Sequence, residues 1–116
     1  MFMALSHLRK MKSKQSKACD ITPAVRAKVF ERDCGVCIIC GKQGIPNSHY
    51  IKRSKGGLGI EENLATMCQE CHNEYDNGTG KYAEAIHTAF RDYLKGCYGD
   101  EWNENDLVYD KYRWVK

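Results

Sequence analysis

The sequence lacks any apolar run long enough to span a bilayer, and nothing near its start has the apolar core of a signal peptide. The opening MFMAL is too short for such a core, and basic and polar residues follow it. We therefore expect a protein of a reducing cytoplasm without membrane contact. Its 116 residues suffice for one small domain, which buries a limited share of its surface and benefits from a staple.

Acidic residues are absent from residues 1–17, which carry five lysines and arginines and so contribute +5 charges. Because the net charge of the whole chain is +3, the remaining residues sum to −2. A basic segment on a nearly neutral body suits sequence-independent contact with phosphates, although a solubilising tail is an alternative. We expect residues 1–20 to be a flexible basic arm and residues 21–116 to form a single domain.

Seven cysteines are many for this length, and four of them form two Cys-x-x-Cys pairs, Cys37/Cys40 and Cys68/Cys71. Without a secretion signal, such pairs indicate metal ligands rather than disulfides. We predict a structural Zn²⁺ site of four thiolates, with Cys34 as the one competing ligand because it precedes Cys37 by three residues. A redox role is an alternative, but neither pair lies in the βαβ context typical of redox motifs.

Helices are predicted on both sides of the cysteine pairs. Thr22 and Pro23 are typical of a helix N-terminus, and the helix is expected to end at residues 33–35. The apolar residues expected to face the core are Val25, Val29 and Phe30, and the basic residues expected to face water or a ligand are Arg26, Lys28 and Arg32.

A second helix is predicted over residues 81–95, because apolar side chains recur there at helical spacing and Gly96 follows as a stop. Its apolar stripe is Tyr82, Ile86, Ala89, Phe90, Tyr93 and Leu94. We interpret His87 as a structural or surface histidine, and Cys19 and Cys97 as small hydrophobic residues. Residues 96–116 are expected to cap the domain as a short helix or turn followed by a strand-like tail.

The segment between the cysteine pairs predicts two extended pieces and a helix. Residues 48–51 are expected to form a strand, residues 52–59 a basic glycine-rich turn, and residues 61–67 a second extended piece. A short helix over residues 71–77 would place His72 and Asp76, at i and i+4, on one face.

This arrangement suits phosphodiester hydrolysis. A neutral imidazole such as His49 can activate water, and a divalent cation near His72 and Asp76 can neutralise the phosphate and assist the leaving group. Asn63 could hold the strand of His49 in register. The basic side chains that could contact phosphates of a nucleic acid are Lys52, Arg53 and Lys55.

These motifs together resemble the HNH endonuclease family. The resemblance covers about residues 22–80 and rests on Ser48-His49-Tyr50-Ile51, Glu62-Asn63-Leu64 and Met67-Cys68-Gln69-Glu70-Cys71-His72. The resemblance implies an α+β fold, namely a small ββα-metal (His-Me finger) domain that is stapled by the zinc site and flanked by helices. Within the family, the sequence is similar to small phage and prophage members. That similarity implies a protein of the bacterial host cytoplasm.

The resemblance also assigns roles. It makes His49 the general base, Asn63 the central asparagine, and His72 a ligand of a catalytic divalent metal. Asp76 falls where many members have a second metal-binding histidine, and its carboxylate favours Mg²⁺ or another hard cation such as Mn²⁺. The implied partner is DNA, cut by a monomer or weak dimer.

One residue departs from the family pattern. Members often carry Asp or His before the base, where this chain has Ser48, a feeble metal ligand. The metal is therefore expected to be held by His72, Asp76, waters and the DNA phosphate. The alternative function is a weakly active or inactive zinc-stabilised module that binds DNA or a protein.

Overall fold

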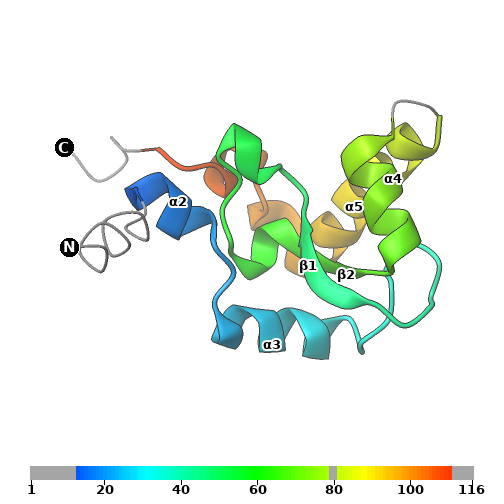
Figure 1. Ribbon diagram of the computed structural model, residues 1–116. Coiled ribbons are helices and arrows are strands. Elements are labelled where there is room, and N and C mark those ends of the chain that lie inside the picture. Colours follow the sequence, from blue (N-terminus) through cyan, green and yellow to red (C-terminus); the bar gives the residue numbers. More distant parts are fainter. Residues whose placement is uncertain (1–12, 79–80, 111–116) are drawn as a thin grey trace, which may run out of the picture.

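The computed structural model describes residues 13–78 and 81–110, and the predicted α+β class is confirmed (Figure 1). A two-stranded antiparallel sheet lies at the centre, with two helices before it and two after it. The elements are α2 (Lys14–Cys19), α3 (Pro23–Arg32), β1 (Ile45–His49), β2 (Leu64–Met67), α4 (Gln69–Asn77) and α5 (Lys81–Tyr98). None of the helices in the described ranges is long and apolar enough to cross a membrane.

Strands β1 and β2 with helix α4 form the predicted ββα unit. Ser48 pairs with Ala65 and His49 with Leu64, while the register is irregular between Ile45 and Ser48. This irregular stretch contains Pro46, whose missing N–H makes regular pairing impossible at that point. The strand predicted over residues 48–51 therefore begins earlier and ends at His49.

Helix α3 begins as predicted, with the Thr22 hydroxyl accepting a hydrogen bond from the Val25 amide at 3.2 Å. Of its predicted apolar stripe, Val29 is fully buried. Phe30 is 48% exposed, so its assignment to the core is wrong. Its ring instead lies over Gly35, where an added Cβ would come within 2.7 Å of the ring.

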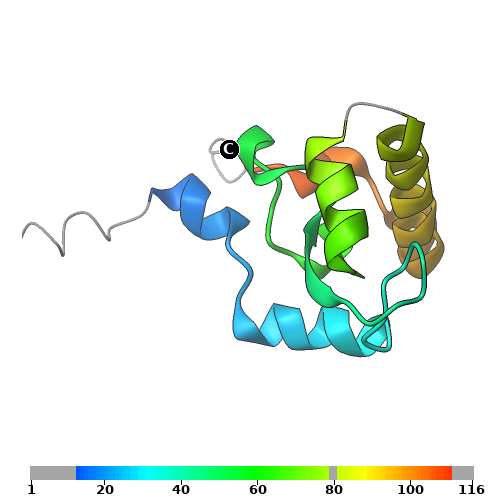
Figure 2. The same ribbon diagram turned by 45° about the vertical axis from the view of Figure 1, so that its right-hand side comes forward.

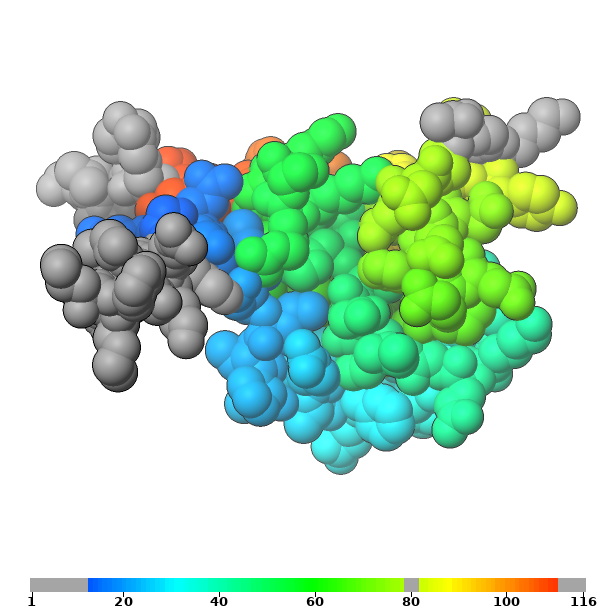
Figure 3. All heavy atoms as spheres, in the orientation of Figure 1, coloured from blue at the N-terminus to red at the C-terminus, as the bar shows by residue number. Residues whose placement is uncertain are grey.

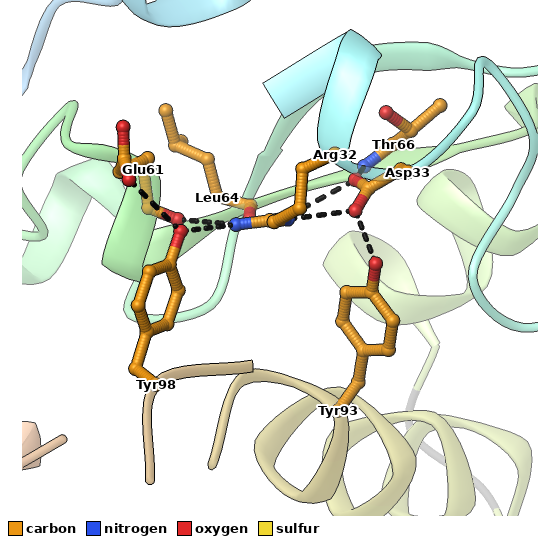
Figure 4. Close-up of polar contacts among 7 residues, drawn as sticks. All are labelled: Arg32, Asp33, Glu61, Leu64, Thr66, Tyr93 and Tyr98. Carbon is orange, nitrogen blue, oxygen red and sulfur yellow. Dashed lines mark hydrogen bonds and ion pairs between the residues drawn. The ribbon is translucent and has the colours of Figure 1, made fainter. Parts of the chain in front are cut away.

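The C-terminal end of α3 carries a buried polar network rather than an exposed cation (Figure 4). Arg32 donates to both carboxylate oxygens of Asp33 at 2.7 and 3.1 Å, and its Nη2 donates to the Leu64 carbonyl at 2.6 Å. Asp33 also accepts from the Thr66 amide at 2.8 Å and from the Tyr93 hydroxyl. The prediction that Arg32 faces water or a ligand is wrong, because this network fastens α3 to β2 and α5.

Helices α4 and α5 pack side by side against the sheet (Figure 2). Tyr75 of α4 and Phe90 of α5 meet in the core, with ring centroids 5.5 Å apart. Helix α5 continues through Gly96 to Tyr98, three residues beyond the predicted end, and Gly96 lies in open space. Two predicted core positions of α5, Tyr82 and Ala89, are exposed.

The segment after α5 covers the loop between the strands. Trp102 Nε1 donates to the Glu62 carbonyl at 2.8 Å, and the Leu58 amide donates to the Leu107 carbonyl at 2.8 Å. Val108 forms an isolated antiparallel bridge with Gly57, which agrees with an extended tail. Residues 111–116 of this predicted cap lie outside the described residues.

Helix α2 lies within residues 1–20, which we expected to be a flexible basic arm. Ser13 caps it, so residues 14–19 are helical, while residues 1–12 lie outside the described residues. Cys19 is buried, as expected of a small hydrophobic residue, whereas Cys97 is exposed and its assignment is wrong.

Candidate active site and metal centre

The four predicted thiol ligands come together at the N-terminus of α4. The sulfur atoms of Cys37, Cys40, Cys68 and Cys71 all lie within 4.8 Å of one another. Cys40 Sγ and Cys68 Sγ are 3.5 Å apart, and sulfur ligands about 2.3 Å from a tetrahedral zinc ion would be about 3.8 Å apart. The cluster therefore fits a metal such as zinc. Cys34, the competing ligand, is not part of it.

Backbone amides support this cluster. The amide of Ile39 donates to Cys37 Sγ at 3.4 Å, and the amide of Cys71 donates to Cys68 Sγ at the same distance. Burial alone raises the pKa of Cys37, but hydrogen bonds from its surroundings outweigh burial and lower the pKa to about 7. Cys37 is thus the thiol that most readily forms a thiolate, whereas burial and the neighbouring thiols raise the pKa of Cys71.

Helix α4 carries the cluster at one end and the next candidate ligands one and two turns later. Cys68 is the N-cap of α4, and His72 and Asp76 follow on one face, as predicted. His72 Nε2 lies 3.0 Å from Asp76 Oδ2. Two adjacent ligands of an octahedral cation with bonds of about 2.1 Å are separated by about 3.0 Å, so this pair fits a shared divalent cation.

A cleft of about 620 Å³ opens beside these two residues. The elements that surround it are the N-terminal part of α3, the end of β1, the loop after β1 and α4, which meet on the face seen in Figure 3. The cleft is lined by Asp20, Ile21, Arg26, Asn47, His49, Lys52, Arg53, Ser54, His72 and Asp76. The structure therefore brings the predicted base and the predicted ligands to one cavity.

Ser48 is fully buried and does not line the cleft. Its hydroxyl lies 2.7 Å from His72 Nδ1, on the side of the ring opposite the nitrogen that faces Asp76. A hydrogen bond to the remaining nitrogen fixes the orientation of a ligating histidine. Ser48 thus contacts the candidate ligand rather than the position of the cation.

His49 lies at the floor of the cleft with only 9% of its surface exposed. Its Nε2 is 2.9 Å from the carbonyl oxygen of Cys19. A carbonyl can only accept, so Nε2 carries the proton and Nδ1 holds the lone pair of the neutral ring. The pKa of His49 is lowered, chiefly by burial. The hydrogen bond to the Cys19 carbonyl acts to raise this pKa, whereas the nearby guanidinium of Arg53 acts to lower it.

Asn63 is fully buried and fastens the loop that follows β1. Its side-chain oxygen accepts from the Ile51 amide at 2.8 Å, and its side-chain nitrogen donates to the Leu58 carbonyl at 2.8 Å and to the Ile51 carbonyl at 3.2 Å. These bonds hold the backbone directly after His49. Asn63 therefore fixes the backbone of Ile51, two residues after His49, and does not line the cleft.

The predicted basic residues divide between two surfaces. Arg53 lines the cleft, Lys55 lines a separate hollow beside α5, and Lys52 lies between the two and lines both. Lys52 donates to the carbonyl of Asp76 at 3.1 Å, and Arg53 is paired with Asp20 at 2.7 Å. Arg26 of α3 adds a cation on another wall of the cleft. The sequence predicted only that Arg26 faces water or a ligand.

The segment from the first cysteine to the end of α4 matches a known family model. Residues 37–78 match the model described as HNH endonuclease. This segment is similar to the HNH endonuclease family. The match spans the thiol cluster, both strands and α4, so the ββα-metal fold of the HNH domain agrees with the structure. No curated protein matches the chain at a significant level.

The match to the HNH family model indicates a nuclease-type activity. Two polar contacts at the cleft nevertheless come from residues that precede the matched segment 37–78, and sequence reasoning missed both. The Cys19 carbonyl and the Asp20 carboxylate come from the end of α2 and the residue after it. A backbone carbonyl carries no side-chain signature in the sequence. The one sequence signal connected with these two contacts is Gly59, whose missing Cβ leaves room for the carbonyls of Cys19 and Asp20.

Proposed function

We propose that the chain is a metal-dependent DNA endonuclease that hydrolyses phosphodiester bonds in the cleft beside β1 and α4. The observation that carries the proposal is the convergence of His49, His72 and Asp76 on one cavity whose walls also carry cations. A buried neutral histidine, a candidate cation site and positive charge are the three parts that water attack on a phosphate requires.

His49 is proposed as the general base. Its Nδ1 takes a proton from water as the water oxygen attacks the scissile phosphorus, and the bond from phosphorus to the leaving oxygen breaks. The Cys19 carbonyl stabilises the proton that remains on Nε2. The lowered pKa of His49 keeps its lone pair free near neutral pH.

His72 and Asp76 are proposed to hold the catalytic divalent metal, with Mg²⁺ or Mn²⁺ as candidates. When bound there, the cation supplies charge neutralisation at the phosphate and at the leaving oxygen. Ser48 orients His72 through Nδ1, which gives this serine a role without metal contact. Lys52, Arg53 and Arg26 contact flanking phosphates, and Lys55 reaches a more distant one.

The four thiols are proposed to hold a structural Zn²⁺. A closed set of four thiolates has no open coordination position, so zinc contributes to folding and not to water activation. Because His49, His72 and Asp76 together form one candidate site in the described part of the chain, the expected product of a monomer or weak dimer is a nicked strand.

The test is a plasmid-nicking assay on zinc-loaded protein, with and without added Mg²⁺ or Mn²⁺. His49→Ala should abolish nicking while DNA binding is retained. His87→Ala is the matched control, because His87 lies on α5 outside the cleft. Zinc-loaded wild type that binds DNA without cutting it in either metal would overturn the proposal and favour the binding module.

A further inference from the structure

Residues 18–20, at the end of α2 and just after it, dock on the HNH segment through Gly59. The Gly59 amide donates to the Ala18 carbonyl at 3.0 Å. A Cβ at position 59 would lie 2.1 Å from the carbonyl oxygen of Asp20 and 2.9 Å from that of Cys19. Contacts below 3.0 Å to backbone atoms force the backbone to move, so residues 18–20 can approach this closely only because residue 59 has no side chain.

A second contact holds the same segment over the cleft. Arg53 Nη1 lies 2.7 Å from Asp20 Oδ1, and both side chains are partly exposed at the rim. Between these two contacts, the Cys19 carbonyl faces Nε2 of His49 at 2.9 Å. Gly59 and Arg53 lie within the HNH segment, whereas residues 18–20 precede it by 17 residues or more.

We propose that residues 18–20, docked on Gly59, are a positioning element of the active site that fixes His49 in the tautomer with a proton on Nε2 and a lone pair on Nδ1. The proposal rests on the proposed function for its kinetic consequence, but the tautomer can be observed without any reaction.

The physical reason is that a neutral histidine can carry its proton on either nitrogen. Without an acceptor at Nε2, a fraction of the rings would be protonated on Nδ1, and those rings could not take a proton from water there. The ring would also lose one of its orienting contacts. Misplacement of a catalytic group by about 1 Å can cost about 100-fold in rate.

The test is Gly59→Ala in the full chain, with Gly96→Ala as the matched control. An added Cβ at Gly96 meets nothing within 4 Å, and neither glycine has a φ in the left-handed region. Gly59→Ala therefore introduces a steric clash, whereas Gly96→Ala adds only helix propensity within α5. Histidine tautomers are read from long-range ¹H–¹⁵N spectra of zinc-loaded protein without added magnesium, and kcat and DNA affinity are measured separately.

We expect wild type and Gly96→Ala to show His49 protonated only on Nε2. Gly59→Ala should show exchange between the two tautomers and a fall in kcat of about 100-fold, with DNA affinity little changed. A single Nε2–H tautomer and unchanged kcat in a folded, zinc-loaded Gly59→Ala protein would overturn the proposal.

Asp20→Asn decides the question if Gly59→Ala fails to fold. It removes the charge that pairs with Arg53 at the exposed rim, so we expect partial tautomer exchange and a smaller loss of kcat. DNA should bind more tightly, because a negative charge leaves the cleft. Unchanged tautomer and kcat in this variant would overturn the positioning role. If Gly59→Ala shows tautomer exchange but the wild type does not cut DNA, the positioning proposal stands and only the nuclease proposal is refuted.

Discussion

Asp33→Asn should remove a large part of the stability of the fold, because it leaves the buried Arg32 without its counter-ion. The Arg32 side chain is only 17% exposed and that of Asp33 is fully buried. Burial alone lowers the pKa of Arg32, but hydrogen bonds with Asp33 and Tyr98 outweigh it and raise the pKa. The ordinary pKa of an arginine is so high that the guanidinium stays charged even when the carboxylate is replaced.

The expected loss follows from the contacts in Figure 4. Asp33 accepts four hydrogen bonds, two from Arg32, one from the Thr66 amide and one from the Tyr93 hydroxyl. An asparagine retains one side-chain acceptor and presents an NH₂ group to Arg32. Two lost bonds to a charged group at about 1.5–3 kcal/mol each agree with the loss of about 3–5 kcal/mol found when one partner of a buried ion pair is removed.

The assay is urea and thermal unfolding of zinc-loaded protein, followed by circular dichroism. We expect a lower midpoint, by about 12–20 °C for a domain of this size. Asp92→Asn is the matched control, since Asp92 is 65% exposed and its pairing with Arg91 at 3.6 Å should contribute at most about 1 kcal/mol. Tyr93→Phe, which removes one bond, should fall between them. A loss for Asp33→Asn no larger than that for Asp92→Asn would refute the reasoning.

Three further outcomes are expected. The pKa of His49 is lowered in the folded protein, so the unfolded chain takes up the proton first as pH falls below about 6.5, and stability should decline in that range. The nicking rate should persist to lower pH than an ordinary histidine would allow. A pH series of unfolding and of nicking checks both expectations. Thr66→Val should raise stability by about 1 kcal/mol in urea unfolding, because the buried Thr66 hydroxyl has no hydrogen-bond partner among the described residues. Cys68→Ser should abolish stoichiometric zinc in metal analysis and lower helicity, whereas the exposed Cys97→Ser should retain both.

Patterns with local physical causes could be predicted from the sequence. The Thr22 cap, the α4 helix and the grouping of four thiols each depend on residue types at fixed spacing, and the structure contains all three. The end of α5 was misjudged at Gly96, because a glycine with no steric conflict can remain helical when the flanking side chains pack.

Features that depend on distant partners could not be predicted. Arg32 was expected at the surface, since an amphipathic pattern cannot reveal that its guanidinium donates hydrogen bonds to Asp33 and to the Leu64 carbonyl in the fold. Likewise, Ser48 was regarded as a missing metal ligand, and only the fold places its hydroxyl against the far nitrogen of His72. The assignment of His49, Asn63, His72 and Asp76 to roles in catalysis stays a prediction.

The adjacency of Cys71 and His72 on α4 has a thermodynamic consequence for the two proposed cations. If zinc at the thiols orders the first turn of α4, then the helix that presents His72 and Asp76 is ordered with it, and each cation should tighten the binding of the other. Such coupling is reciprocal. Saturating magnesium or manganese should therefore slow the transfer of zinc to a chelating dye, and the measured retardation would report occupancy of the second site without any DNA present.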